Sequence, residues 1–366
     1  MMQDALIESA LDQILAVWQV DSNDLRSRGA NGFDWLPGSY LVSVRAVPAD
    51  KSDPFYVMLQ GIGGVDPREN GVRLSVSTRI VEDFPLKSSQ AVTLLDQLSP
   101  TLCSTYSLVY PPQALLEASR SVDAPHDLEL FSSVYIDPNL AGWLPNFLAQ
   151  MAVMQPIDAE LHGSSLPAMF GGGLPAFEDG VKRKELDDIL KVAEQIFVPA
   201  GARPSKWSGS DEFVAFARDF GRSENCFANG DSTGLTAEVP FGNGSALIQL
   251  WTDQFHPNLG NGLLVTLLLP HKAAEVSDGG VAALNYLEAR AWTEFPNFGC
   301  WHQRDTGSDR GILPAHSTFI PNALYRPDLI QNLALWEMAR ARWVRQTFYP
   351  DMQDRLMSDI LEERFR

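Results

Sequence analysis

The sequence contains one pattern twice, and this repeat constrains the fold more than any other feature. The first copy covers residues 55–80 and the second covers residues 246–269. Each copy has two apolar runs of β type, separated by an x-Pro pair and an Asn-Gly pair. These pairs are Asp66-Pro67 and Asn70-Gly71 in the first copy, and His256-Pro257 and Asn261-Gly262 in the second. Because Asn-Gly tolerates the positive φ of tight hairpin turns, each copy is predicted to form two paired strands.

The spacing between the copies extends beyond this hairpin. The two prolines are 190 residues apart (257 − 67) and the two glycines are 191 apart (262 − 71). Val281, Leu284 and Leu287 follow Val92, Leu95 and Leu98 by 189 residues, and Ser317–Ile320 follows Ser133–Ile136 by 184. A nearly constant offset across several segments predicts tandem copies of one domain, with loop insertions causing the small drift.

Each copy has the same predicted order of elements: helix, three strands, helix, two strands, helix. In the first copy the hydrophobic periodicity places helices at 5–20, 88–98 and 144–155, and further strands at 40–47, 103–110 and 128–136. In the second it places helices at 186–197, 211–220, 280–291 and 329–344, and further strands at 235–239, 298–303 and 317–320. Short turns between neighbouring strands favour an antiparallel sheet and an α+β class.

Four segments follow from this pattern. The first α+β domain is expected at 1–156 and the second at 185–350. Residues 157–184 are rich in Gly, Pro and Ser, which is typical of a linker. Residues 351–366 are predicted to form a charged helical tail.

Composition excludes several classes of partner. The 366 residues carry a formal charge of −18, which argues against sequence-independent nucleic-acid binding and against anionic membrane surfaces. No apolar run is long enough to span a bilayer, and residues 1–20 lack the pattern of a signal peptide. The three cysteines, Cys103, Cys226 and Cys300, form no CxxC pair, which fits a reducing compartment. We therefore expect a cytoplasmic protein.

The sequence offers little catalytic chemistry. It has no GxGxxG, Walker A or HExxH motif, and Gly171–Gly173 lacks the flanking lysine of a phosphate-binding loop. No catalytic, cofactor-binding or metal-binding residue is therefore assigned, and no cofactor is expected. One local concentration leaves an alternative open: Cys300 and His302 share a strand face, with Asp305 and His316 nearby in sequence. This region is the basis of an alternative metal-dependent or small-molecule enzyme.

Aromatic residues are concentrated in the second copy. They include Trp292, Phe295, Phe298, Trp301, Trp336 and Trp343. These rings either fill the core, as large apolar side chains usually do, or line a groove for a peptide. Four aromatic residues of the second copy are the candidates for peptide binding: Trp251, Phe255, Trp301 and Phe319.

The order of elements, the repeated x-Pro to Asn-Gly hairpin and the Ser-x-x-Ile strands resemble the fold of type III secretion chaperones and YbjN-like proteins, in a tandem-domain bacterial form. The resemblance implies a non-enzymatic protein that binds polypeptide segments or dimerises through its sheet and helices. We therefore expect a protein- or peptide-binding module with a chaperone-like or regulatory role, either a monomeric pseudo-dimer or a homodimer. A third interpretation is an internal pseudo-dimer with a purely structural role.

Overall fold

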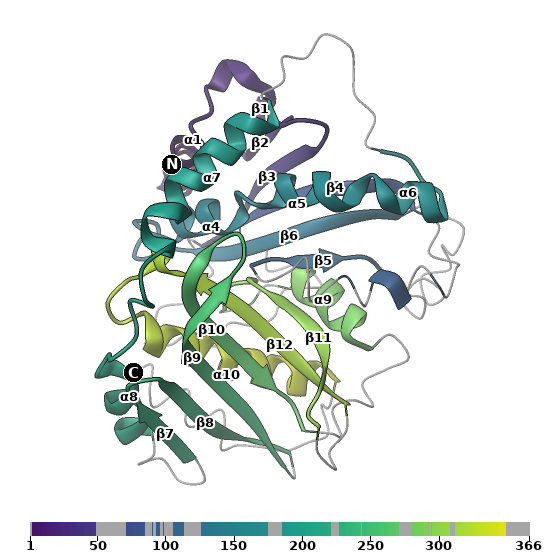
Figure 1. The fold of residues 1–366 in the computed structure, drawn as a ribbon. Helices are drawn as coiled ribbons and strands as arrows, with labels where there is room; N and C mark the ends of the chain where they lie inside the picture. The colour runs from purple at the N-terminus through teal and green to yellow at the C-terminus, as the bar shows by residue number, and fades with distance from the viewer. Residues whose placement is uncertain are drawn as a thin grey trace. The chain divides into compact units, whose positions relative to one another are not determined.

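The computed structural model describes the chain in several ranges. These are residues 2–48, 71–84, 90, 93–95, 98, 105–112, 126–174, 185–220, 227–242, 244–270, 280–291, 293, 295–307 and 312–348. They form two compact units (Figure 1). Unit 1 contains the described residues up to Gln195 together with Asn285–Cys300. Unit 2 contains the described residues of Ile196–Leu284 and those from Trp301 onward. The predictions for residues 55–59, 175–184 and 351–366 lie outside the described residues.

Unit 1 is built on a six-stranded antiparallel sheet. Its strands are β1 (Leu25–Gly29), β2 (Gly32–Trp35), β3 (Leu41–Pro48), β4 (Val72–Phe84), β5 (Ser107–Val109) and β6 (His126–Ile136). They lie in the order β1-β2-β3-β4-β6-β5. Alternate residues of β3, β4 and β6 are buried on one face, as expected for strands packed under helices.

Helices cover that face of sheet 1. They are α1 (Met2–Trp18), α4 (Leu144–Ala152), α5 (Gln155–Gly163) and α6 (Ser165–Phe170). In α1, apolar residues at i, i+3 and i+4 are buried, and Trp18 stacks on Trp35 of β2 with ring centroids 5.3 Å apart. Trp18 Nε1 also donates to the Ala149 carbonyl of α4 at 2.9 Å. The helix α4 packs on α1 and β6, and α5 packs on β4 (Figure 1).

The second sheet is also six-stranded and antiparallel. Its strands are β7 (Phe227–Asp231), β8 (Gly234–Phe241), β9 (Gly244–His256), β10 (Gly260–Leu268), β11 (Cys300–Asp305) and β12 (Ile312–Pro321). The helices of this half are α7 (Leu186–Gly201), α8 (Glu212–Phe220), α9 (Gly280–Arg290) and α10 (Leu329–Phe348). Sheet 2 is covered on one face by α8, which packs on β7 and β8, and by α10, which packs on β8, β9 and β10.

The two sheets share one topology, which confirms the predicted tandem α+β architecture. Sheet 2 has the order β7-β8-β9-β10-β12-β11, strand for strand that of sheet 1. The register agrees too, because Val72 pairs with Ile136 in sheet 1 and Leu263 pairs with Ile320 in sheet 2. The offsets of these residues are 191 (263 − 72) and 184 (320 − 136), as the sequence pattern predicted.

The first run and the turn of the first predicted hairpin, residues 55–70, lie outside the described residues. The second run forms β4, which pairs with β3 on one side and with β6 on the other. In sheet 2 the hairpin exists, but its turn is at 257–259 and Asn261-Gly262 lies inside β10. Gly260 supplies the positive φ of +76°, and a Cβ there would lie 2.3 Å from the Gly201 Cα.

Three described strands were not predicted: β1 and β2 in unit 1 and β7 in unit 2. The edge strands β1 and β7 are short and polar and show no alternating apolar pattern, and β2 has only four residues. Strand β9 is the equivalent of β3 in the other sheet, at an offset of 204 (248 − 44). Val44 of β3 pairs with β4 at the position where Ile248 of β9 pairs with β10.

The predicted linker is not a linker over its first part. Residues 157–170 lie in α5 and α6, which bury Ile157, Ala159 and Leu166. Pro156 stands in the first turn of α5, where a missing N–H costs nothing. Gly173 then forms a bridge with Glu82 of β4. This segment therefore belongs to unit 1, and its Gly and Ser content concealed a buried helical face.

A segment of the predicted second domain is part of unit 1. Asn297 exchanges two backbone hydrogen bonds with Ser133 of β6, at 2.8 and 3.1 Å. Arg73 of β4 donates to the carbonyls of Ala289 and Arg290, which are free at the C-terminal end of α9. These bonds place Asn297 along the edge of β6 and the C-terminal end of α9 against the Arg73 side chain, within unit 1. The predicted boundaries 1–156 and 185–350 therefore do not coincide with the compact units.

Candidate binding surface

Two of the four predicted binding residues lie in one row across sheet 2. Leu264 of β10 pairs with Trp251 of β9 on one side and with Phe319 of β12 on the other. Trp251 is 38% exposed, whereas Phe319 is 3% exposed. The His256 ring lies against Phe319 with centroids 5.3 Å apart. Trp251, Leu264, Phe319 and His256 lie on the face of sheet 2 opposite to α8 and α10. We call this face the open face of sheet 2.

A β-bulge next to Trp251 directs the third predicted residue elsewhere. Asp253 has a φ of +54°, and the register of β9 against β10 shifts at this point. The bulge is held by the Asp253 carboxylate, which accepts from the Ser205 N–H at 3.0 Å, and by the Thr252 hydroxyl, which donates to the Thr233 carbonyl at 3.0 Å. Phe255 follows at the hairpin tip, opposite Asn261 and 69% exposed.

Trp301, the fourth predicted residue, does not join this surface. It is 1% exposed and meets the His316 ring edge-on, with centroids 5.4 Å apart. His316 faces α10, because its Nδ1 lies 3.2 Å from the Glu337 carboxylate. Trp301 is therefore a core residue on the helix-covered side of sheet 2.

The candidate metal ligands do not converge. His302 Nε2 lies 2.8 Å from the Ser317 hydroxyl, and Ser317 is on the open face of sheet 2. His316 is the neighbouring residue on β12, so its side chain lies on the opposite face. Within the part of the chain that the structure describes, no three His, Cys, Asp or Glu side chains could hold a metal ion. The geometry therefore gives the enzyme alternative no metal centre among these residues.

The sequence did not reveal the edge of sheet 2 formed by β7. Among the described residues β7 has a strand partner on one side only, β8. Phe227, its first residue, is 60% exposed on the open face, beside Glu238 of β8. Beneath β7, Gly230 fits tightly on α8, since a Cβ there would lie 2.2 Å from the Phe213 carbonyl oxygen. Strand β7 thus packs closely on α8 and has no partner along its outer edge within the described part of the chain.

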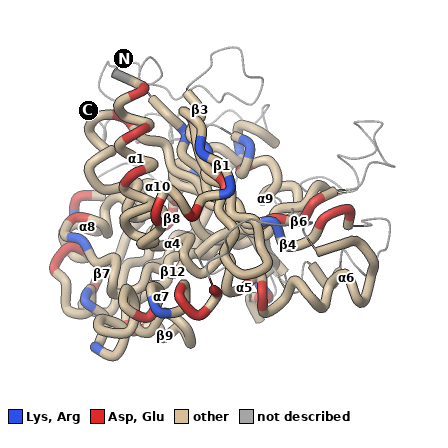
Figure 2. Tube along the Cα trace, turned by 90° about the horizontal axis from the view of Figure 1, so that it is seen from above, with Lys and Arg blue, Asp and Glu red and all other residues tan. Residues whose placement is uncertain are grey.

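Charge separates the two sheets. Residues 227–270, which contain β7 to β10, include Asp231, Glu238 and Asp253 but no Lys or Arg. The corresponding strands of sheet 1 carry five arginines: Arg26, Arg28, Arg45, Arg73 and Arg79. Figure 2 shows basic residues on β1 and β3 and acidic residues along α1. This absence of cations in 227–270 is the sequence signal that would have identified the surface.

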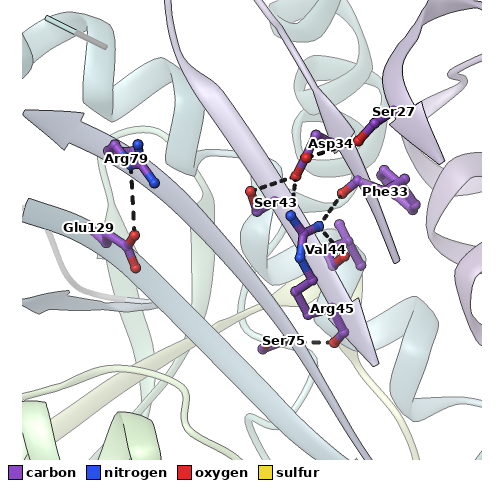
Figure 3. Close-up of polar contacts among 9 residues, drawn as sticks. All are labelled: Ser27, Phe33, Asp34, Ser43, Val44, Arg45, Ser75, Arg79 and Glu129. Atoms are coloured by element: carbon purple, nitrogen blue, oxygen red, sulfur yellow. Dashed lines mark hydrogen bonds and ion pairs between the residues drawn. The ribbon is translucent and has the colours of Figure 1, made fainter. Parts of the chain in front are cut away.

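The carboxylates at matching positions of the two sheets have different surroundings. Asp34 of β2 accepts from Ser27 at 2.9 Å, Ser43 at 2.8 Å and Arg45 at 2.5 Å (Figure 3). Burial alone would raise the pKa of Asp34, but these three donors lower it below its usual value. Glu238, at the offset of 204, faces Phe227 and Leu247 across the strands. It is exposed and has no hydrogen bond or ion pair among the described residues.

Buried charges lie on the helix-covered side of sheet 2. Glu337 and Arg340 of α10 are 2.5 Å apart and buried together with His316. Burial alone would raise the pKa of Glu337, but Arg340 and His316 lower it, so the carboxylate is ionised at neutral pH. This group is sealed in the core and gives a substrate no access.

Comparison with known proteins does not extend these observations. No family model, curated protein or solved structure matches the chain. No helix in the described ranges is both long and apolar enough to cross a membrane. Function is therefore argued from the surface itself.

Proposed function

We propose that the protein is a non-enzymatic, cytoplasmic binding module that holds an extended polypeptide segment on the open face of sheet 2. The observation that carries the proposal is the exposure of Trp251 of β9 and Phe227 of β7 on one face of sheet 2, whose strand β7 has no outer partner among the described residues. Exposed aromatic side chains are favoured anchors for partner proteins because they bury a large area at low entropic cost. The resemblance to secretion chaperones points to the same class of function.

The binding test compares matched positions of the two sheets. Full-length protein is titrated with an array of extended peptides, and binding is measured by fluorescence anisotropy. Trp251→Ala is expected to weaken every positive peptide by about tenfold, as removal of a hot-spot aromatic residue does. Val47→Ala is the control, because Val47 occupies the equivalent position in sheet 1 (251 − 47 = 204) and is also exposed. Equal effects of the two substitutions, or no positive peptide at all, would contradict the proposal.

One observation favours a second candidate. The identical strand order of the two sheets is what an internal pseudo-dimer with a structural role would show. Such a protein would bind no peptide in the array, and Trp251→Ala would change nothing but local packing.

A further inference from the structure

We infer that the outer edge of β7 accepts an additional antiparallel strand from a partner that carries apolar and cationic side chains together on one strand face, two residues apart. The inference rests on the proposed function and specifies both the mode of binding and the chemistry of the partner. It is carried by three features of the described residues: the outward backbone groups of β7, the exposed Phe227, and the absence of positive charge on β7 to β10.

The backbone geometry of β7 identifies the groups that would bind. A two-residue turn, Ser232-Thr233, joins β7 to β8, and Asp231 pairs with Gly234 at its ends. Such a turn is closed by a hydrogen-bonded pair, and these pairs alternate along an antiparallel ladder. The N–H and C=O groups of Ala228 and Gly230 therefore point to the outer edge. Neither residue has a backbone hydrogen bond to another element in the described part of the chain.

This edge lacks the usual protection against strand addition. Edge strands are commonly blocked by Lys, Pro or a bulge. The equivalent strand β1 carries Arg26 and Arg28, and Arg28 forms an ion pair with Asp12 of α1 at 2.7 Å. Strand β7 has the sequence Phe-Ala-Asn-Gly-Asp, without Lys, Arg, Pro or a register shift. The edge strand β1 thus carries cations that oppose strand addition, and β7 carries none.

Charge on the surface selects the partner. Glu238 lies beside Phe227, is exposed, and has no ion pair with a cation within the described residues. The carboxylate of Asp231 is occupied by the turn, where it accepts from the Thr233 N–H and hydroxyl at 2.7 and 2.6 Å. Arg218, on the helix below, is paired with Asp219 at 3.5 Å. A lysine or arginine two positions from an apolar residue would lie on the same face of the added strand. The cation would then meet Glu238 while the apolar residue covers the Phe227 ring.

A second copy of the chain is a poorer occupant. Each chain carries a formal charge of −18, so two copies repel. Antiparallel pairing of two β7 strands about Asn229 would also place Phe227 opposite Asp231, with no cation for either Glu238. The same argument favours a basic segment of another protein.

The test uses octapeptides in which every second residue is Thr and the other four positions alternate Val with Lys, Val with Glu, or Gly with Lys, so that both residue types lie on one face of the added strand. The full chain is expected to bind the Val-Lys peptide at least about tenfold more tightly than the other two, with weaker binding at high salt. Ala228→Pro removes an outward N–H without removing a bond to β8, and is expected to weaken binding by about tenfold or more. Arg28→Pro at the matched position of β1 is the control and should leave binding unchanged. Glu238→Lys should weaken binding several-fold.

Each other result has a distinct meaning. If Trp251→Ala weakens Val-Lys binding while Ala228→Pro does not, the proposed function stands and strand addition at β7 is wrong. If Val-Glu binds as tightly as Val-Lys, the inferred partner chemistry is wrong. A dimer in sedimentation that Ala228→Pro dissolves would assign the edge to a second copy and overturn the inference. If no peptide binds and Trp251→Ala has no effect, the proposed function fails as well. Circular dichroism of both proline variants checks that the sheets remain folded.

Discussion

The same position in the two units holds a buried polar cluster, but one cluster is neutral and the other is charged. In unit 1, Gln155 of α5 accepts from the Thr78 hydroxyl and donates to the Ser132 hydroxyl, both at 3.0 Å. In unit 2, the residue that corresponds to Ser132 is His316 (316 − 132 = 184), which lies against Glu337 and Arg340. Duplicated sheets thus tolerate different chemistry under their helices, provided that each polar group finds a partner.

The comparison makes the charged cluster the more vulnerable one. Glu337→Gln is expected to lower the free energy of unfolding by about 3–5 kcal/mol, because it leaves the buried Arg340 guanidinium without its carboxylate. Urea unfolding of the full chain at neutral pH measures this. Because the pKa of Glu337 is depressed in the folded state, the carboxylate stabilises the protein above its unfolded pKa of about 4.3. That contribution is lost as the pH falls through the lower folded pKa, so the penalty of the substitution should shrink in acid. If Glu337→Gln lowered the free energy of unfolding by less than Gln155→Leu, the matching substitution in unit 1, the comparison would be wrong.

The neutral cluster should be less costly to break. Gln155→Leu leaves the buried hydroxyls of Thr78 and Ser132 without their amide partner, and is expected to cost about 1–3 kcal/mol. The control is the triple variant Thr78→Val, Ser132→Ala and Gln155→Leu, which replaces the whole network by apolar groups. It should recover most of the loss, measured by the same urea unfolding. A triple variant as unstable as the single one would show that packing, and not hydrogen bonding, sets the cost.

A partly buried carboxylate sharpens the contrast with Glu337. Asp158 of α5 has no cation near it among the described residues, and burial raises its pKa to about 7. Between its unfolded pKa of about 3.9 and pH 7 the folded state binds more protons, so unfolding free energy falls as the pH rises through this window. Asp158→Asn should remove this fall, with a gain of roughly 1–2 kcal/mol at pH 8 and no change at pH 4. Thermal unfolding across pH measures it, and parallel curves for wild type and variant would contradict the assignment.

The architecture was readable from the sequence where periodicity was strong. The offsets of 191 and 184 identified equivalent positions of β4, β10, β6 and β12 before any coordinates were considered. Helices α8 and α10 were found because Phe213, Phe216 and Phe220, and the apolar residues of α10, repeat at helical spacing. The edge strands failed this test, since β1 and β7 bury almost nothing.

The candidate surface could be predicted only in part. Aromatic enrichment identified Trp251 and Phe319, but it could not separate them from Trp301, because alternation places Trp301 on the opposite face only once the register of β11 is known. The segment 285–300 was assigned to the second copy by its place in the chain. Its position in unit 1 depends on the Arg73 guanidinium, the Ser107 hydroxyl and the Ser133 backbone, and these groups give no local sequence signal.

The smallest effect is expected at Asp34 of sheet 1. Asp34→Asn removes the charge that Arg45, Ser43 and Ser27 share, but Arg45 keeps bonds to the carbonyls of Phe33 and Val44, both at 2.9 Å. Because this pair is partly exposed, the loss should be below about 1 kcal/mol at neutral pH, and it should vanish in acid once Asp34 is protonated. Glu238→Gln is the matched change in sheet 2. It should leave the free energy of unfolding unchanged and weaken the binding of cationic peptides. If Glu238→Gln instead destabilises the fold as much as Asp34→Asn, then Glu238 has a structural role, and the contrast between a self-satisfied polar face and an acidic binding face is lost.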